Sequence, residues 1–294
     1  MDIPQQLANG IFLGSIYALF ALGYTLVLGV LDILNLAHAA VFMLGAFIGL
    51  VVVLDLGLPI WVALVAAFVG AGLVGMLLER IAFRPLARRA ESNFAGLISS
   101  LAMGSLFVAV VLQLFGPNVQ RFPPATIPDT VFILAGARIR LIQIIVIGVS
   151  VALMAWLTWV VERTRFGRAL RAVADSPRAA AVLGIDVNRV YAQTFFLSSA
   201  LGGVAGVLFG LAFNSVASDI GLSVELKGIA AIIVGGMGSL PGAMVGGLVI
   251  GLSEVFAVAI IGSTWRDAVA FGILFGILLV RPQGLFGRSG LRGD

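Results

Sequence analysis

The strongest constraint on this chain is a series of apolar runs, most of them about 20 residues long. A helix of that length crosses the hydrocarbon core of a bilayer, whereas the strands of a membrane barrel alternate polar and apolar residues over about 10 positions. The composition agrees, since 61% of the residues are hydrophobic and only 11% are charged. We therefore expect an all-α polytopic membrane protein.

The number of crossings depends on two of these runs. The runs lie at about 7–30, 31–54, 60–78, 94–115, 141–161, 190–213, 226–234, 243–261 and 268–280. The second contains Asp32, Asn35 and His38, so it is either a full crossing or a broken, re-entrant helix. The run at 226–234 is too short to cross alone. We predict eight to nine transmembrane helices with broken or re-entrant segments.

The distribution of arginine predicts the orientation. Four arginines lie in 80–89, six in 163–189 and three in the tail after 280, which together make thirteen of the eighteen basic residues. The spans between these segments place all three on one side, which should be cytoplasmic. The proline-rich loop after 115 and the polar stretch 214–223, predicted to be a surface loop, then face outward. The N-terminus also lies outside if 31–54 is a full crossing.

Several kinds of chemistry are excluded. The longest hydrophilic piece is under about 30 residues, so residues 1–294 form one membrane domain with no room for a soluble one. The sequence has no cysteine and only one histidine, His38, which excludes disulfides and a multi-histidine metal site. A nucleotide-binding P-loop needs Gly-Lys-Ser/Thr, and the single lysine, Lys227, is followed by Gly228. We expect a non-catalytic chain without a cofactor of its own.

The loop 163–189 has local signals for two short helices. Phe166, Leu170 and Val173 recur near helical spacing, which predicts a short amphipathic helix. Ser176 and Pro177 then suit the cap and first position of a second helix over 178–183. Gly184 suits a left-handed C-terminal cap. The loop either fixes the membrane topology by its charge alone or forms a surface to which another protein binds.

Polar residues within the apolar runs form a second group of candidates. Asn35 and His38 are three residues apart, so we expect them to share a helix face. They either line a substrate path or bond to neighbouring helices. Glu254 lies in the middle of a span and must be protonated, paired or hydrated. Lys227 is its predicted partner, whereas Glu225, two residues before Lys227, would not pair with that lysine on a helix.

The glycine-rich stretch 235–242 cannot continue a helix. Non-helical backbone at membrane depth is tolerated where it is buried in protein or lines water, and broken helices often mark the working centre of a transporter. The alternative is an ordinary tight turn at the cytoplasmic surface. If the stretch is a broken helix at membrane depth, the candidates for the substrate path include Gly235, Gly236 and Gly238.

Four blocks of the sequence carry a family resemblance. They lie at 14–23, 35–38, 167–185 and 235–246, and the last two, beginning Gly-Arg-Ala-Leu-Arg-Ala and Gly-Gly-Met-Gly-Ser-Leu-Pro-Gly, are quite specific. The chain resembles, over nearly its full length, the LivH-type permease subunit of the bacterial branched-chain amino acid ABC importer family. The resemblance implies a multi-pass protein of the bacterial inner membrane.

The resemblance also implies partners. They are a second homologous permease, two cytoplasmic ATPase subunits that hold ATP and magnesium, and a periplasmic amino-acid binding protein. The loop 163–189 would be the coupling element that docks on the ATPase. Its contacts would be Gly167, Arg168, Arg171, Arg178, Ala179, Ala180 and Gly184. Arg178 stands where the general importer pattern has an acid. The residues placed along the substrate path, as a hypothesis, are Tyr17, Asn35, His38, Gly235, Gly236, Gly238 and Glu254.

Two alternatives remain at this stage. Permeases for urea or short amides are similar within the family. A secondary transporter driven by an ion gradient would use Glu254, Asp32 or His38 as a proton relay. The capped loop argues against the second alternative, because such a carrier needs no docking helix.

Overall fold

The computed structural model describes residues 2–89, 93–124, 126–134 and 136–287. Its elements are α1 Ile3–Leu31, α2 His38–Leu54, α3 Ile60–Leu78, the π-helix η1 Glu79–Phe83, α4 Arg84–Arg89, α5 Asn93–Phe115, β1 Val131–Leu134, β2 Ala137–Arg140, α6 Leu141–Arg163, α7 Arg165–Asp175, α8 Pro177–Val182, α9 Val187–Phe213, α10 Ile220–Gly235, α11 Leu240–Ile261, the 3₁₀ turn η2 Ser263–Trp265 and α12 Arg266–Val280. Arg288 and Arg292 of the basic tail lie outside the described residues.

The fold is an all-α integral membrane bundle. Within the described ranges, seven helical segments are long and apolar enough to cross a bilayer: α1, α3 continued into α4, α5, α6, α9, α11 and η2 with α12. The helices α2 and α10 are shorter, with 17 and 16 residues. The number of crossings, eight to nine, stays a prediction, because it depends on how these two helices are counted.

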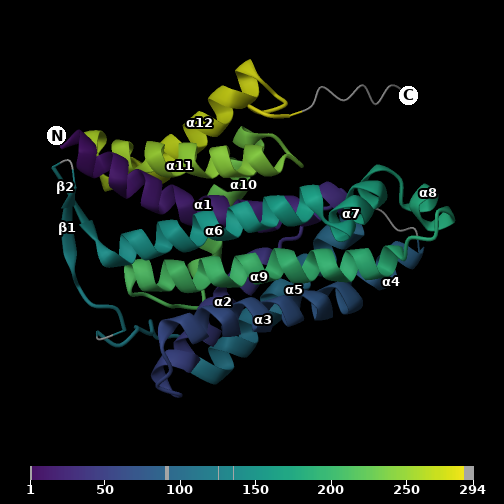
Figure 1. Ribbon diagram of the computed structural model, residues 1–294, viewed down its shortest axis with the longest axis horizontal. Helices are drawn as coiled ribbons and strands as arrows, with labels where there is room; N and C mark the ends of the chain where they lie inside the picture. The colour runs from purple at the N-terminus through teal and green to yellow at the C-terminus, as the bar shows by residue number, and fades with distance from the viewer. Residues whose placement is uncertain (1, 90–92, 125, 135, 288–294) are drawn as a thin grey trace.

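The two ends of the bundle differ in character. One end holds the C-terminal ends of α1, α3 and α6 together with α4, α7 and α8, and we call it the arginine end. The opposite end holds the N-terminus and the antiparallel β1–β2 hairpin, and we call it the hairpin end (Figure 1). A hydrogen bond of 3.1 Å from the Gln5 side-chain amide to the Arg138 carbonyl joins α1 to the hairpin.

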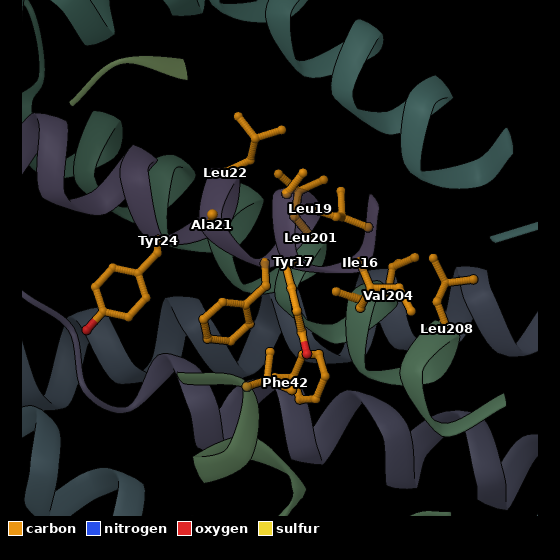
Figure 2. Packing of buried hydrophobic residues seen from close by; sticks show 14 of the residues in the cluster. Ile16, Tyr17, Leu19, Ala21, Leu22, Tyr24, Phe42, Leu201, Val204 and Leu208 are labelled. Carbon is orange, nitrogen blue, oxygen red and sulfur yellow. The ribbon is translucent and has the colours of Figure 1, made fainter. Parts of the chain in front are cut away.

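The central helix is α1, which packs against α6, α9, α10 and α11. Small residues let the backbones approach where lipid gives no hydrophobic drive. A Cβ added at Gly251 of α11 would lie 2.3 Å from the Cα of Gly14. Figure 2 shows aliphatic side chains of α1, such as Ile16 and Leu19, packed near Leu201 and Val204 of α9.

The two short helices start inside the bundle and their N-terminal ends meet. The His38 ring, at the start of α2, lies 4.7 Å from the ring of Phe20 in the middle of α1. A Cβ added at Gly221, in the first turn of α10, would lie 2.2 Å from the Ala39 carbonyl oxygen. The run 31–54 is therefore a broken helix, in which an extended segment leads back from the end of α1 to the start of α2.

The prediction of a surface loop at 214–223 was wrong from residue 220 onward, and the loop that remains, 214–219, is partly buried. Val216 and Ile220 are buried, Val216 pairs with Gln120, and α10 already begins at Ile220. The polar residues that suggested a loop include Asp219, the N-cap residue of α10. Polar residues are common at helix starts, so polarity alone does not distinguish a start from a loop.

The segment between the apolar runs 60–78 and 94–115 is partly helical. The helix continues through η1 into α4, as far as Arg89. Arg84 donates from Nε and Nη2 to the two carboxylate oxygens of Glu79, at 3.0 and 2.9 Å. This two-point contact holds the π-helical turn, because the extra residue in such a turn brings positions five apart together.

Candidate functional site

A buried ionic cluster joins four helices, and Glu254 of α11 is at its centre. Tyr17 of α1 donates its hydroxyl to Glu254 Oε2 at 2.9 Å, and Lys227 of α10 donates to Oε1 at 3.0 Å. Arg266 of α12 places Nε 3.1 Å from the same Oε1 in an ion pair without hydrogen-bond geometry. Asp267 Oδ1 lies 3.2 Å from Lys227 Nζ. We call these five residues the Glu254 cluster.

The Glu254 cluster balances its charges within the membrane bundle. It contains two cations and two anions, so no net charge is buried, and Lys227 Nζ also lies 5.7 Å from the centre of the Tyr17 ring. Burying a charge is costly unless a partner compensates for it. The Glu254 side chain is buried, whereas that of Arg266 is 44% exposed and that of Asp267 is 67% exposed, so the cluster opens on the α12 side. It ties α10 and α12 to α11.

Asn35 and His38 lie at the break between α1 and α2. Asn35 is outside the helix, so the prediction that the two share a helix face was wrong. The Asn35 Oδ1 atom accepts from the Ala37 amide at 3.2 Å, and its carbonyl accepts from the His38 amide at 3.1 Å. These bonds turn the chain into α2. The His38 Nε2 atom lies 3.3 Å from the Phe20 carbonyl oxygen, which identifies Nε2 as the protonated nitrogen.

The same junction contains polar atoms with no partner among the described residues: Tyr24 Oη, Asn35 Nδ2, His38 Nδ1 and, on α10, Glu225 Oε1. Sequence reasoning did not select Tyr24. The signal that could have found it is a phenolic hydroxyl in the middle of a span, where a buried tyrosine usually needs a partner.

The loop 163–189 forms two short helices, as predicted. Thr164 caps α7, since its Oγ1 accepts from the Gly167 amide at 3.1 Å. A Cβ added at Gly167 would lie 2.0 Å from the Val161 carbonyl oxygen, so only glycine lets α7 fold back against the end of α6. The Arg171 guanidinium donates to that same carbonyl. These contacts fix the angle between α6 and α7.

The second helix, α8, is held by caps at both ends. Ser176 Oγ accepts from the Ala179 amide at 3.3 Å, and Pro177 occupies the first turn. Gly184 has φ +84°, and the following amide of Ile185 donates to the Ala180 carbonyl at 3.0 Å, as in a Schellman-type end. The tip is therefore a rigid turn of helix.

The exposed side chains at the tip of α8 include two that sequence reasoning passed over. Val182 is 88% exposed and Leu183 is 79% exposed, whereas Ala180, predicted to make a coupling contact, is 1% exposed. Ala180 packs inward and supports the helix. Arg168, Arg178 and Ala179 are exposed. Large apolar side chains in a polar loop are a common mark of a protein contact.

The glycine-rich stretch forms a tight turn between α10 and α11. Gly236 and Gly238 have φ +109° and +78°, and Ser239 caps α11 by accepting from the Gly242 amide at 3.2 Å. The amide of Phe286 in the tail donates to the Gly235 carbonyl at 2.8 Å. This arrangement favours the predicted alternative of an ordinary turn at the end of the bundle.

A groove of about 640 Å³ connects this turn to the coupling loop. Its walls come from the end of α1, from α6 and α7, and from the turn itself, including Gly29, Arg171, Asp175 and Ser239. The glycine-rich turn therefore lies at the arginine end beside α7.

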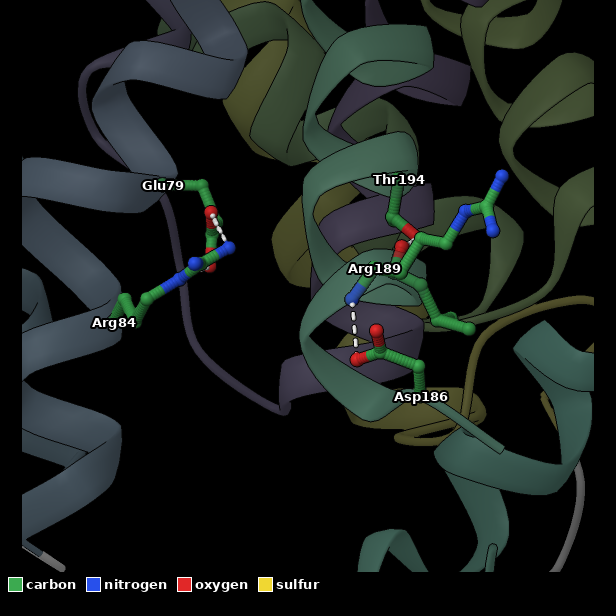
Figure 3. A network of polar contacts seen from close by, with 6 residues as sticks. Glu79, Arg84, Asp186, Arg189 and Thr194 are labelled. Carbon is green, nitrogen blue, oxygen red and sulfur yellow. Dashed lines mark hydrogen bonds and ion pairs between the residues drawn. The ribbon is translucent and has the colours of Figure 1, made fainter. Parts of the chain in front are cut away.

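A second cavity of about 300 Å³ at the same end lies between η1 and the start of α9. Arg84 and Pro177 line it, so the arginine-rich segment after α3 and the loop before α9 meet there. Figure 3 shows the Glu79–Arg84 pair opposite the start of α9, where Asp186 Oδ1 accepts from the Arg189 amide at 3.1 Å. The described arginines of both segments thus gather at one end of the bundle.

The predicted substrate-path residues fall into separate places. Tyr17 and Glu254 are in contact, and the structure brings Lys227 to Glu254 as the charge pattern predicted. Asn35 and His38 lie at the α1–α2 junction. The glycines of the α10–α11 turn lie at the arginine end and contact neither group, so the structure does not support placing them with these residues.

Comparison with known proteins identifies the family. The sequence profile described as "Branched-chain amino acid transport system / permease component" matches residues 6–279. The chain belongs to this permease family. It is 37% identical to the high-affinity branched-chain amino acid transport system permease protein BraD of Pseudomonas aeruginosa, over 97% of this chain and 95% of that one. It is 35% identical to the permease protein LivH of Escherichia coli, with the same coverage.

A more distant relative and a solved structure extend the comparison. A probable branched-chain amino acid permease LivH of Methanocaldococcus jannaschii is 28% identical over 96% of this chain and 91% of its own length. A chain of PsaBC from Streptococcus pneumoniae in complex with Fab superposes with a TM-score of 0.50 at 17% identity, covering 96% of this chain and 93% of that one. The similarity to PsaBC concerns the fold alone.

Proposed function

We propose that this chain is the transmembrane permease subunit of an ATP-driven importer for branched-chain amino acids. The relatives that cover nearly its whole length are named as permeases of such systems. The observation that carries the coupling role is the capped tip of α8, which presents Val182 and Leu183 to solvent at the arginine end. Two adjacent, almost fully exposed aliphatic side chains at the tip of a rigid loop suit a surface that a protein partner covers.

The coupling loop is built to transmit force. Gly167 and Arg171 fix α7 to the end of α6, and the caps of α8 leave little freedom at its tip. A push on α8 is therefore carried into a membrane-spanning helix. The groove beside α7 separates it from the α10–α11 turn, which leaves room for α7 to move.

An importer of this family would also need partner proteins. Two cytoplasmic ATPase subunits would contact α8 and would hold the ATP and magnesium. A second homologous permease would complete the path, and a periplasmic binding protein would deliver the amino acid to the hairpin end. In this proposal the arginine end faces the cytoplasm and the chain lies in the bacterial inner membrane; the positive-inside rule supports that orientation. For coupling, the binding free energies of the ATPase must differ between the two states of the permease.

Replacement of the two exposed aliphatic residues tests the docking role. The double variant Val182→Ser, Leu183→Ser should reduce ATPase subunits co-purified in mild detergent by about tenfold or more, since each lost apolar contact is worth roughly 1.5–3 kcal/mol. Val119→Ser, which changes an exposed valine before the hairpin, is the matched control. Equal amounts of ATPase with both variants would refute a docking role for α8.

Uptake by the reconstituted complex tests the substrate class. Proteoliposomes that contain the permease pair, the ATPases and the binding protein should accumulate leucine, isoleucine or valine when ATP is supplied. Accumulation of urea or a short amide instead would show that the chain is a permease for those substrates. Accumulation by the purified chain without ATPases would show a gradient-driven carrier.

A further inference from the structure

Four polar groups at the meeting point of α1, α2 and α10 have atoms that make no hydrogen bond to any described residue. They are the Tyr24 hydroxyl, Asn35 Nδ2, His38 Nδ1 and Glu225 Oε1. Tyr24, Asn35 and His38 are each at most 1% exposed, and Glu225 is half-buried. We call these four residues the junction cluster.

The packing of α10 directs Glu225 toward this junction. Gly221 and Gly228 lie four residues before and three residues after Glu225, so all three share one face of α10. Added Cβ atoms would lie 2.2 Å from the Ala39 carbonyl oxygen at Gly221 and 2.3 Å from the Phe20 ring at Gly228. The face that bears Glu225 is therefore pressed against the start of α2 and the middle of α1.

The other members of the junction cluster gather around that contact. The His38 ring lies 4.7 Å from the ring of Phe20 and 5.4 Å from that of Tyr24. Asn35 binds the backbone at the start of α2 through Oδ1, which leaves the Nδ2 donor to the junction. In Figure 2 the Tyr24 side chain extends away from the labelled aliphatic side chains.

Within the part of the chain that the structure describes, no cation forms an ion pair with Glu225. Lys227, two residues along, is held by Glu254 and Asp267. A buried polar group without a partner costs about 1–3 kcal/mol, and an unpaired carboxylate at membrane depth costs more. Four such groups in one place indicate that a bound molecule supplies the missing hydrogen-bond partners.

The charges at the junction suit a molecule with both a cation and an anion. Glu225 offers a carboxylate to a cation. The start of α2 carries partial positive charge, and the Tyr24 hydroxyl and Asn35 Nδ2 add two hydrogen-bond donors, which suits a carboxylate. Phe20 and Phe42, in contact with one another, add an apolar wall.

We propose that the junction cluster binds the charged head of an α-amino acid during its passage. Glu225 takes the ammonium group, and the start of α2 with Asn35 Nδ2 and the Tyr24 hydroxyl takes the carboxylate. This site rests on the proposed function as an amino-acid importer. It is separate from the Glu254 cluster, whose ionised members are paired with one another and so act in holding α10, α11 and α12 together.

The test uses the complete complex in proteoliposomes, with leucine uptake and ATP hydrolysis measured together. Glu225→Gln and Tyr24→Phe should each lower the number of leucine molecules taken up per ATP by about tenfold, the order of one lost hydrogen bond to a charged group. Glu225→Asp should recover part of the loss. Asp219→Asn, which alters an exposed carboxylate beside the same helix and removes no cap bond, should leave the ratio unchanged.

The outcomes separate the site from the wider function. An unchanged uptake-to-ATP ratio in Glu225→Gln overturns the site. If this variant does not assemble, Tyr24→Phe decides, because it removes one oxygen atom and keeps the ring contacts. Lower thermal stability with a normal ratio would show a purely structural cluster and would also overturn the site. If the wild-type complex takes up no amino acid, the proposed function fails instead.

Discussion

At the scale of single residues, the Glu254 cluster shows how a membrane bundle accommodates ionised groups. Glu254 receives a hydroxyl and two cations, and Lys227 receives two carboxylates. Each charge thereby faces an opposite one, and the desolvation penalty is offset by several short contacts. The only lysine of the chain lies in this cluster, so a single substitution removes the cation that two carboxylates share.

Removal of Lys227 should destabilise the bundle. Lys227→Met leaves an excess of negative charge beside Glu254 and should lower the free energy of unfolding by about 3 kcal/mol. Adding Glu254→Gln should cost less than the sum of the two single changes, because the groups are coupled. Thermal unfolding in detergent measures both variants, with the exposed Arg121→Met as the control. Strict additivity would show that the two side chains do not interact.

At the scale of elements, glycine sets the distances between helices. A Cβ added at Gly45 of α2 would lie 2.2 Å from the Cα of Gly203 in α9, so the two backbones are in direct contact. Such approaches let α2, although short, be held on several sides. The same principle holds α7 against α6 at Gly167.

Alanine at Gly45 should therefore force α2 and α9 apart. We expect Gly45→Ala to lower the melting temperature and the yield of folded protein, by a free energy of about 1–3 kcal/mol. Gly148→Ala in α6 is the matched control, since nothing lies within 4 Å of the added Cβ. That change should be neutral or slightly stabilising, because alanine favours the helix over glycine. Equal melting temperatures for the two variants would contradict the packing argument.

At the scale of the whole molecule, the two ends of the bundle differ in their proposed partners: one end would contact the ATPases and the other would receive the amino acid from the binding protein. The arginine end gathers α7, α8 and the α10–α11 turn, whereas the hairpin end carries the N-terminus and the β1–β2 pair (Figure 1). Between them, the N-terminal ends of α2 and α10 meet inside the protein. A site at this meeting point lies between the two ends, as alternating access requires.

Cysteine labelling tests this orientation directly, because the sequence has no cysteine of its own. In intact cells stripped of the outer membrane, Asp129→Cys should react with an impermeant maleimide. Arg178→Cys in α8 should react only after the membrane is opened. Both side chains are exposed in the structure, so burial does not explain a lack of reaction. The reverse pattern would invert the proposed topology.

The sequence alone determined the features that depend on neighbouring residues. The long apolar runs, the Ser176 cap of α8 and the turn at Gly184 were all predicted, because each follows from signals within a few positions. The family resemblance was likewise visible in four short blocks and agrees with the match over residues 6–279. Where polarity was ambiguous, the local signal gave the wrong element, as at 220–223, which belong to α10 and not to the predicted loop.

The tertiary structure decided everything that depends on residues far apart in the chain. Asn35 and His38 were chosen for a shared helix face, but the break before α2 places them in a turn beside α1. The role proposed for Tyr24 and Glu225 depends on the packing of α10 against that turn. Neighbouring residues set which helices form, whereas glycine contacts and buried charge partners, 27 residues apart for Lys227 and Glu254, set where those helices meet.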